Sequence, residues 1–371
     1  MSAVLSETIL QFGTGKFLRC FADLFAHEAN QTTQPAGRVV ALQSTGTDRA
    51  KLLSRQGGRY HVAIRGLQRN EHVDRLVEVQ SISRALSAAH DWQQVLAVGQ
   101  SASLRAIISN TTEAGYALQD DAADDAPPRS FPAKLLQVLQ ARHRAGAAGV
   151  TILPCELYDG NADRLLVLVK EQARRWRLPE TLGDWLQGEC SWRNTLVDRI
   201  VSAPSPGDPW AAGDPLFAVA EPFALWLIEG AAHMPGLIDH PAVRSVERLA
   251  SYALRKVRIL NGAHTALAAK ARPLGFETVR QALADPEIGA WLQGLLFEEI
   301  VPTLEGRTDE PEQFARQTLE RFANPFLDHR LADIALHHDV KVQTRLAPTR
   351  VEFLQRFGRV PKRLDEVLST A

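Results

Sequence analysis

Residues 8–25 read TILQFGTGKFLRCFADLF, and this stretch decides the fold. A short apolar strand candidate runs into a glycine turn, and a helical apolar pattern follows. A strand, a glycine turn and a helix in this order can bind the pyrophosphate of a dinucleotide at the helix N-terminus. Gly13 would permit the tight turn, and Gly15 would let the backbone approach the phosphates. Leu18 replaces the third glycine of the usual fingerprint, so these residues alone leave a plain strand-to-helix turn open.

The alternation of strands and helices in the first part of the chain predicts a mostly parallel sheet. Further strands are expected at 38–42, 59–66, 73–79, 106–109 and 149–154, with a helix at 131–145. From about residue 244 the apolar pattern is almost wholly helical, with helices expected at 243–270, 275–284, 288–303, 311–322 and 330–338. We therefore expect an α/β protein with a Rossmann-like dinucleotide-binding domain at 1–200 and an all-α substrate and catalytic domain at 201–371.

Length and composition exclude several classes of protein. A chain of 371 residues with 45% hydrophobic and 23% charged residues suits two globular domains. The net charge of −1 favours neither nucleic acid nor a membrane surface as a partner. No apolar run reaches the roughly 18 residues of a membrane span, and the N-terminus does not read as a signal peptide. Three widely spaced cysteines predict reduced thiols in the cytoplasm, and no zinc-binding motif is present, so no metal is expected.

The strand at 38–42 ends at a small polar segment that includes Ser44. An acidic residue for the ribose hydroxyls of NAD is missing there, and so is an arginine for the 2′-phosphate of NADP. Asp48 and Arg49 follow, and either could serve one of these cofactors. The residues by themselves leave NAD and NADP equally open.

The strand at 106–109 also ends in small polar residues, at the position where open α/β sheets bind ligands. Ser109, Asn110 and Thr111 could contact a cofactor there, and Glu113 could form a hydrogen bond near its base. An Asn/Thr-capped loop without a ligand is the alternative.

The stretch RKVRILNGAH at residues 255–264 combines three side chains suited to carbonyl and alcohol chemistry. On an α-helix, Lys256 and His264 would lie about 80° apart around the axis, and Asn261 within roughly 60° of His264. A lysine beside apolar walls can lose its charge and act as a base. An amide can donate to a developing alkoxide, and an imidazole can orient a substrate oxygen. A half-buried helix with its polar edge in water is the alternative.

This stretch resembles the signature of the polyol-specific long-chain dehydrogenases, the mannitol dehydrogenase family. Other segments resemble the same family: the GTGKFLR turn at 13–19, SNTTEAG at 109–115, PCEL at 154–157, NTLVDRI at 194–200, VAEPF at 219–223 and the Lys341-x3-Arg345 pattern. They cover nearly the full chain, which is most similar to the branch of tagaturonate and fructuronate reductases.

The resemblance implies reversible, metal-independent reduction of a ketohexuronate to an aldonate, with NAD favoured as cofactor. Lys256 would be the general acid/base, Asn261 would polarise the carbonyl, and His264 would position the substrate. Asp198 would bind substrate hydroxyls, with Arg199 anchoring it or reaching the cofactor. The implied cofactor-binding residues are Gly13, Gly15, Phe17, Arg19, Ser44, Ser109, Asn110, Thr111 and Glu113.

Lys341 and Arg345 are four residues apart and would present two cations on one helix face, where they could hold a substrate carboxylate. An exposed basic face is the alternative. Mannitol-oxidising relatives carry an asparagine where Leu157 stands and a substrate-binding arginine where Asp333 stands. Both departures weaken the alternative function, an NAD-dependent mannitol or polyol 2-dehydrogenase acting on neutral ketoses. A non-catalytic dinucleotide sensor is a further alternative, and the oligomeric state, monomer or dimer, stays open.

Overall fold

The computed structural model describes residues 5–69, 71–230, 237–326 and 329–369. The chain divides into two compact units. Unit 1 comprises Met1–Ile64, Arg75–Ala220 and Ala224–Leu249, and unit 2 comprises Arg65–Asp74, Glu221–Phe223 and Ala250–Ala371. The boundary predicted at residue 200 lies inside unit 1.

A six-stranded parallel sheet forms the centre of unit 1. Its order is β5 (Ile82–Ser87), β2 (Arg38–Gln43), β1 (Glu7–Phe12), β6 (Ala106–Ser109), β7 (Thr151–Pro154) and β8 (Ser191–Trp192). Counted along the chain, these strands follow the order 3-2-1-4-5-6 of the Rossmann fold. The direction of winding reverses between β1 and β6, where this fold binds its ligand. The predicted Rossmann-like sheet is confirmed.

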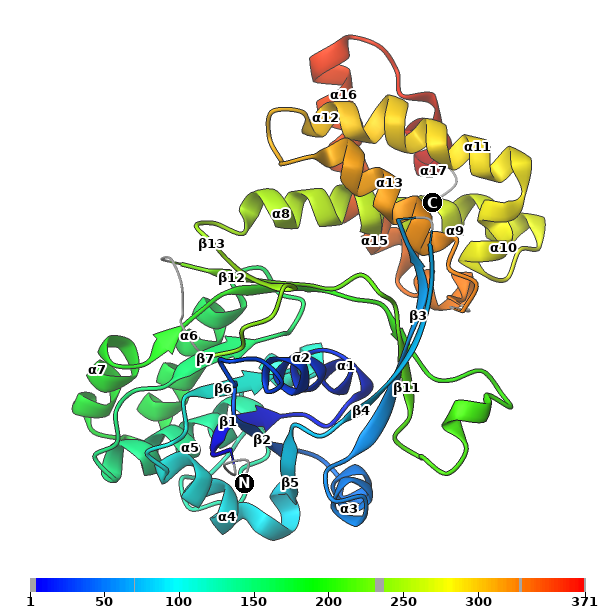
Figure 1. Ribbon diagram of the computed structural model, residues 1–371. Coiled ribbons are helices and arrows are strands. Elements are labelled where there is room, and N and C mark those ends of the chain that lie inside the picture. The colour runs from blue at the N-terminus through cyan, green and yellow to red at the C-terminus, as the bar shows by residue number, and fades with distance from the viewer. Residues whose placement is uncertain (1–4, 70, 231–236, 327–328, 370–371) are drawn as a thin grey trace. The chain divides into compact units, whose positions relative to one another are not determined.

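Helices and a buried apolar core accompany this sheet. The helical segments are α1 (Lys16–Arg19), α2 (Ala22–Ala29), α3 (Asp48–Arg55), α4 (Ala88–Gln100), η1 (Glu113–Tyr116), α5 (Phe131–Arg144), α6 (Asn161–Arg175) and α7 (Glu180–Gly188). Helices α4 and α5 pack against each other in Figure 1. Leu10, Phe12 and Val40 are fully buried in the same cluster as Leu135 of α5. The apolar runs of the strands therefore supply the core, as expected for a parallel sheet covered on its faces.

The helix predicted after the glycine turn is broken between α1 and α2. Phe21 adopts φ −129° and ψ −95°, outside the helical region. Its ring is fully buried and stacks on that of Phe17 while also contacting that of Phe25. The burial of this aromatic ring accounts for the interruption.

Two smaller sheets use the remaining strands. One has the order β10 (Val201–Ser202), β11 (Ala218–Ala220), β3 (Tyr60–Gln68) and β4 (Glu71–Val79). The other has the order β13 (Val243–Val246), β12 (Leu225–Glu229) and β9 (Thr195–Asp198). The helix predicted at 243–270 is therefore wrong in its first seven residues, because the backbone of β13 pairs in parallel with β12 and α8 begins only at Ala250.

Unit 2 is helical apart from its short share of β3 and β4, which confirms the predicted helical C-terminal region. Its first helices are α8 (Ala250–Arg255), the π-helix η3 (Lys256–Asn261), α9 (Gly262–Ala271), η4 (Arg272–Leu274), α10 (Val279–Ala284), α11 (Pro286–Gly294) and the π-helix η5 (Leu295–Ile300). They are followed by α12 (Val301–Leu304), α13 (Pro311–Phe322), α14 (Leu331–Ile334), α15 (His338–Arg345), α16 (Ala347–Phe357) and α17 (Lys362–Ser369). Leu267 of α9 lies at the centre of their common core.

Candidate functional site

The glycine turn after β1 has the geometry of a phosphate cradle. Gly13 has φ +131°, and a Cβ there would lie 3.0 Å from Leu18 Cδ1 and 3.2 Å from the carbonyl oxygen of Asn110. Only glycine adopts this conformation in so little space. A Cβ on Gly15, by contrast, would meet no atom within 4 Å. The turn is closed on its inner side and open on the side where a ligand would approach.

Arg19 lies directly behind this turn with unsatisfied donors. Its side chain is 3% exposed, and its Nε and Nη1 atoms have no hydrogen-bond partner among the described residues. The guanidinium carbon lies 5.5 Å from the centre of the Tyr60 ring. The Oγ atom of Ser44, after β2, is likewise buried without a partner. Because buried donors are normally satisfied, these atoms fit a bound anion or hydroxyl group, as a dinucleotide would supply.

The loop after β6 lies beside the glycine turn. The Asn110 N–H donates to the carbonyl oxygen of Phe12, the last residue of β1, at 3.1 Å. The Ser109 hydroxyl, however, donates inward to the carboxyl of Glu156, and the Asn110 amide donates to the carbonyl oxygen of Cys155. The structure therefore brings the two predicted loops together but turns these polar groups into the protein. The Glu113 side chain lies outside the described part of the chain.

Two residues in this region were quoted from the sequence only as part of the PCEL motif. Glu156 accepts hydrogen bonds from the Ser109 hydroxyl and the Thr111 N–H of this loop. The sequence gives no signal for it beyond that motif. Cys155 is a free, fully buried thiol, and burial raises its pKa well above the usual value. A buried thiol with a raised pKa is inert compared with a reactive cysteine.

Asp198 and Arg199 lie at the end of β9 in unit 1 and are both buried. Arg199 Nη1 donates to the carbonyl oxygen of Cys20 at 2.8 Å, and its guanidinium carbon lies 5.8 Å from the centre of the Phe25 ring. Arg199 is thus tied to the segment that follows the glycine turn. The predicted contact of Asp198 with substrate hydroxyls stays a prediction.

In unit 2, Lys256 and Asn261 are the first and last residues of the π-helix η3. The N–H of Gly262 donates to the carbonyl oxygen of Val257, five residues earlier, instead of four. The helical-wheel angle expected between Lys256 and His264 assumed an uninterrupted α-helix and is therefore wrong, whereas Asn261 and His264 are joined by the α-helical start of α9. The side chains of Lys256 and Asn261 are half-buried. Such π-helical turns occur frequently at functional sites.

Arg258, inside the same turn, fixes it to α16. Its guanidinium is buried, and Nη1 donates to the Thr349 hydroxyl at 2.5 Å while Nη2 donates to Glu352 at 3.0 Å. Glu352 also binds Arg307 at 2.7 Å. The turn that carries Lys256 and Asn261 is thus held from its buried side.

His264 is buried in α9 with an unsatisfied ring nitrogen. Its ring stacks on Phe322 with centroids 4.1 Å apart and meets His329 edge-on at 4.7 Å. Nε2 has no partner within the described part of the chain. Burial, and then the charges of His329 and other nearby basic groups, lower the pKa of His264 well below its usual value. His264 is therefore a neutral imidazole that can form a hydrogen bond with a ligand.

Lys341 and Arg345, both on α15, belong to the surroundings of His264. Arg345 Nη1 donates to the hydroxyl of Thr265, the residue next to His264, at 3.2 Å. Lys341 Nζ donates to the carbonyl oxygen of Ile334 at 2.8 Å. Burial, and then the charge of Arg345, lower the pKa of Lys341, and both cations act on the His264 imidazole. Within the described residues, no carboxylate forms an ion pair with either cation, and two such neighbouring cations suit an anionic ligand.

Sequence reasoning missed the two other basic groups beside His264. His329 carried no pattern of its own, and Arg321 lies in α13. Arg321 forms a buried, two-pronged ion pair with Glu221 at 2.8 and 2.9 Å. Glu221 belongs to the quoted VAEPF motif, so that motif was the available signal for this pair.

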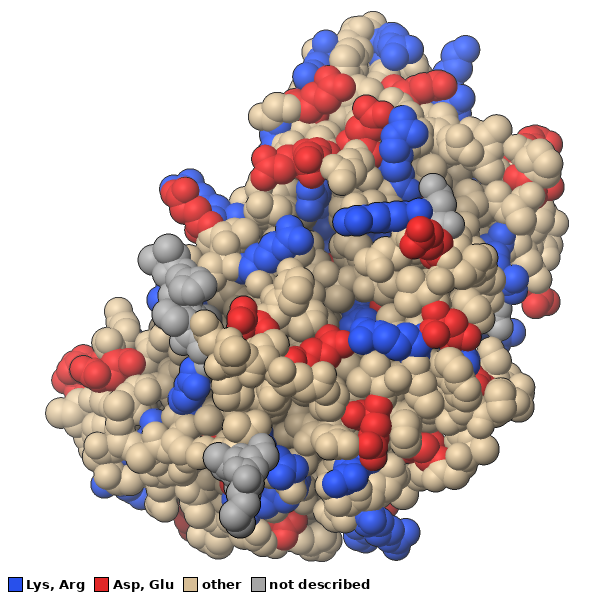
Figure 2. All heavy atoms as spheres, viewed as in Figure 1, with Lys and Arg blue, Asp and Glu red and all other residues tan. Residues whose placement is uncertain are grey.

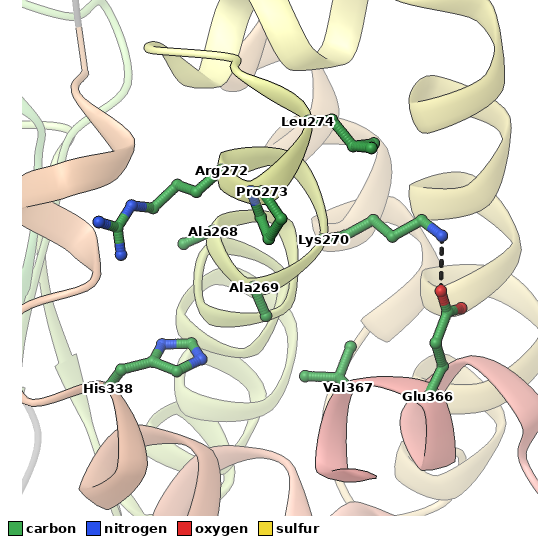
Figure 3. A pocket seen from close by; sticks show the side chains of 9 residues that line it. All are labelled: Ala268, Ala269, Lys270, Arg272, Pro273, Leu274, His338, Glu366 and Val367. Carbon is green, nitrogen blue, oxygen red and sulfur yellow. Dashed lines mark hydrogen bonds and ion pairs between the residues drawn. The ribbon is translucent and has the colours of Figure 1, made fainter. Parts of the chain in front are cut away.

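A pocket of about 580 Å³ lies elsewhere in unit 2, between α9, η4, α15 and α17 (Figure 3). Its lysine, Lys270, is neutralised by Glu366 at 2.5 Å, and none of the predicted site residues lines it. On the face drawn in Figure 2, basic and acidic side chains are interspersed. Among the described residues there is no cluster of three or more potential metal ligands, and no helix is long and apolar enough to cross a membrane.

Comparison with known proteins identifies matches along the whole chain. Residues 7–239 match the mannitol dehydrogenase Rossmann domain, and residues 248–369 match the mannitol dehydrogenase C-terminal domain. An altronate oxidoreductase of Klebsiella pneumoniae is 39% identical over 98% of this chain and 78% of its own length. An altronate oxidoreductase of Bacillus subtilis is 36% identical over 96% of this chain and 77% of its own length.

Solved structures show the same fold at lower identity. A substrate-free D-sorbitol dehydrogenase has a TM-score of 0.87 at 22% identity, over 99% of this chain and 80% of its own. A Pseudomonas fluorescens mannitol 2-dehydrogenase, in complex with NAD and D-mannitol, has a TM-score of 0.80 at 20% identity, over 99% of this chain and 78% of its own.

Proposed function

This chain belongs to the mannitol dehydrogenase family, and on that premise we propose that it reduces a ketohexuronate such as tagaturonate or fructuronate to the aldonate with NADH, and catalyses the reverse reaction. Relatives at 36–39% identity named altronate oxidoreductase support a sugar acid as substrate. The mannitol 2-dehydrogenase of the same fold was solved with NAD, which supports this cofactor.

The observation that carries the proposal is the pair of cations beside a neutral imidazole. Lys341 and Arg345 lie next to His264, whose Nε2 has no protein partner within the described residues. A substrate carboxylate would compensate the two positive charges, and a substrate hydroxyl would satisfy the imidazole. A neutral ketose would leave the two cations uncompensated.

The chemistry assigned to unit 2 is proton transfer and stabilisation of charge. When bound, the nicotinamide supplies the hydride that the keto carbon accepts. Lys256, as an ammonium, donates its proton to the keto oxygen, while the Asn261 amide donates a hydrogen bond to the charge developing there. In the reverse direction Lys256, as a neutral amine, takes the proton from the hydroxyl. Arg258, through Thr349 and Glu352, holds the backbone of this turn in place.

The residues assigned to the cofactor lie in unit 1. The open side of Gly15 and the unsatisfied donors of Arg19 would hold the pyrophosphate, and Ser44 would contact the adenosine ribose. Phe17 would support the turn through its stacking on Phe21, and the loop after β6 would contact the nicotinamide half. The free, buried cysteines fit a reducing compartment such as the cytoplasm.

A depletion assay tests the substrate and the cofactor together. NADH and NADPH absorbance would be followed with tagaturonate, fructuronate and fructose under identical conditions. We expect rapid oxidation of NADH with one or both uronates and slow oxidation with fructose. Fructose turnover equal to that of the uronates would support the polyol dehydrogenase alternative, and no turnover with any of the three would contradict the proposal.

A further inference from the structure

Glu156 connects the two strands on one side of the Rossmann switch point. It follows β7 and is 4% exposed. One carboxyl oxygen accepts the N–H of Thr111 at 2.8 Å, and the other accepts the hydroxyls of Ser109 and Tyr116 at 3.1 Å each. These donors lie between Ser109, the last residue of β6, and Tyr116 of η1, so a single carboxyl binds both ends of this segment.

Among the residues that the structure describes, no salt bridge pairs this carboxyl with a cation. Its contacts among the described residues are hydroxyl and backbone N–H groups, and no lysine or arginine pairs with it. Burial raises the pKa of Glu156, although the hydrogen bonds act in the opposite direction. A buried carboxyl without a counter-charge is destabilising compared with an apolar side chain. Its presence is therefore better explained by what it holds than by a contribution to stability.

The loop that Glu156 holds is in direct contact with the glycine turn. Asn110 donates its N–H to Phe12, and its carbonyl oxygen lies 3.2 Å from the position that a Cβ of Gly13 would occupy. A shift of this loop by even a few tenths of an ångström would therefore change the space inside the turn. Both segments follow the strands β1 and β6, between which a Rossmann fold binds its dinucleotide.

The far end of the loop is equally constrained. A Cβ on Gly115 would lie 2.5 Å from the Thr111 hydroxyl, so the chain packs closely on Thr111 there. The Tyr116 ring packs on that of Tyr158 with centroids 4.9 Å apart, which orients its hydroxyl toward Glu156. The carboxyl is thus the centre of a small rigid assembly built from β6, η1 and the turn after β7.

We propose that Glu156 is a positioning residue for the nicotinamide cofactor, which acts by holding the Ser109–Thr111 loop against the glycine turn. It acts through Thr111 and Ser109 and does not itself need to touch the cofactor. The inference rests on the proposed function only in placing the dinucleotide at this turn, and it does not depend on which sugar acid is reduced.

The test is the affinity of the full-length chain for NADH, measured by fluorescence titration without substrate. Glu156→Gln keeps the shape of the side chain and an acceptor for the Thr111 N–H, but its NH2 group cannot accept. The Ser109 and Tyr116 hydroxyls therefore lose a charged acceptor and must turn to accept instead. We expect its Kd for NADH to rise about tenfold. Tyr116→Phe and Ser109→Ala remove one donor each, and we expect Kd increases of about threefold. The KM for NADH should rise in the same order, while kcat changes less.

Asp121→Asn is the matched control. Asp121 is also a buried carboxyl that organises a loop in unit 1, accepting from Arg129 and Ser130, but it touches neither the glycine turn nor the Ser109–Thr111 loop. We expect Asp121→Asn to lower the melting temperature and leave the Kd for NADH unchanged. A merely structural Glu156 would behave in the same way.

Several outcomes would overturn the inference. One is a folded Glu156→Gln protein whose Kd for NADH lies within twofold of the wild-type value. Another is an Asp121→Asn protein that loses as much affinity for NADH as Glu156→Gln does. If Glu156→Gln does not fold, unchanged affinity in both Tyr116→Phe and Ser109→Ala decides against it. A wild-type chain that binds neither NADH nor NADPH would overturn the cofactor placement as well. If NADH binding depends on Glu156 but no uronate is reduced, only the proposed substrate fails.

Discussion

Lys256 and Asn261 stand at the two ends of one π-helical turn, five residues apart. In an α-helix, residues at this spacing would point about 140° away from each other. In a π-helix the backbone bond itself spans five residues, so side chains at this spacing lie along one side of the helix. Under the proposed function, the amine and the amide of this one turn would act on the same substrate atom.

Lys256→Ala should reduce turnover with a uronate by two to four orders of magnitude, because the reacting oxygen loses its proton donor, a contribution of roughly 10²–10⁴-fold. The Kd for NADH should stay nearly unchanged, since Lys256 is assigned to the substrate. Stopped-flow or steady-state assays with NADH would measure the first quantity, and fluorescence titration the second. Lys270→Ala is the control, because Lys270 pairs with Glu366 and should leave turnover intact. Unchanged turnover in Lys256→Ala would remove this lysine from the mechanism.

Charge reversal at Arg345 tests the carboxylate site. Arg345→Glu should lower kcat/KM for a uronate by about 100-fold or more, because a charge-assisted hydrogen bond is lost and a like charge is introduced. Any weak activity on fructose should hardly change, since fructose has no carboxylate. Arg316→Glu on α13 is the control, as Arg316 is exposed, forms a surface pair with Glu312 and packs on the Phe297 ring. Equal losses on both substrates would show that Arg345 supports the fold rather than the carboxylate.

Gly13→Ala tests whether the turn requires glycine. The methyl group would meet Leu18 and the Asn110 carbonyl in a backbone conformation with φ +131°, at a cost of about 1–3 kcal/mol. We therefore expect a lower denaturation midpoint and a weaker affinity for NADH. Gly183→Ala in α7 is the matched control, because a Cβ there meets nothing within 4 Å and alanine favours a helix by about 1 kcal/mol. A Gly13→Ala protein as stable as Gly183→Ala would contradict the packing described for this turn.

The sequence predicted four strands of the parallel sheet, β1, β2, β6 and β7, because burial of a parallel strand leaves a continuous apolar run, as at Ile107 and Ile108. It did not predict β5 and β8. Short strands such as β13 carry no such run, since their pairing depends on a neighbour far along the chain. The π-helix was not predictable from periodicity, because it alters the very period on which a helical wheel relies.

The candidate site likewise combines residues that a local motif reveals with residues that only the fold brings together. Gly13 and Arg19 were recognisable because local motifs place them next to each other in the chain. Glu156 and His329 were not singled out, because their roles arise from contacts with residues about 40 or more positions away, Ser109 for the former and His264 for the latter. Local sequence reports the chemistry that one segment supplies, while the partners that orient it come from tertiary packing.

Asp23 gives a prediction for the dependence of stability on pH. Its carboxyl is fully buried behind the glycine turn, and burial raises its pKa to about 7, against the lowering effect of a hydrogen bond from Gln11 and of the charge on Arg19. The folded protein therefore binds this proton more tightly than the unfolded chain. The stabilisation by this proton is fully present below the unfolded pKa of 3.8 and is lost as the pH rises through about 7.

Asp23→Asn removes this dependence while keeping the size of the side chain. The difference in free energy of unfolding between Asp23→Asn and wild type should shift in favour of the variant by roughly 2 kcal/mol between pH 5 and pH 7, and then level off. Denaturant titrations at pH 5, 6, 7 and 8 would measure it. Glu7→Gln is the control with the opposite sign: burial alone would raise the pKa of Glu7, but hydrogen bonds from Arg84 and Ser83 lower it. Its stabilising effect is lost only as the pH falls through that lowered pKa, so the difference between Glu7→Gln and wild type should change little from pH 5 to pH 8. A constant difference for Asp23→Asn as well would mean that Asp23 is already ionised in the folded protein at pH 5.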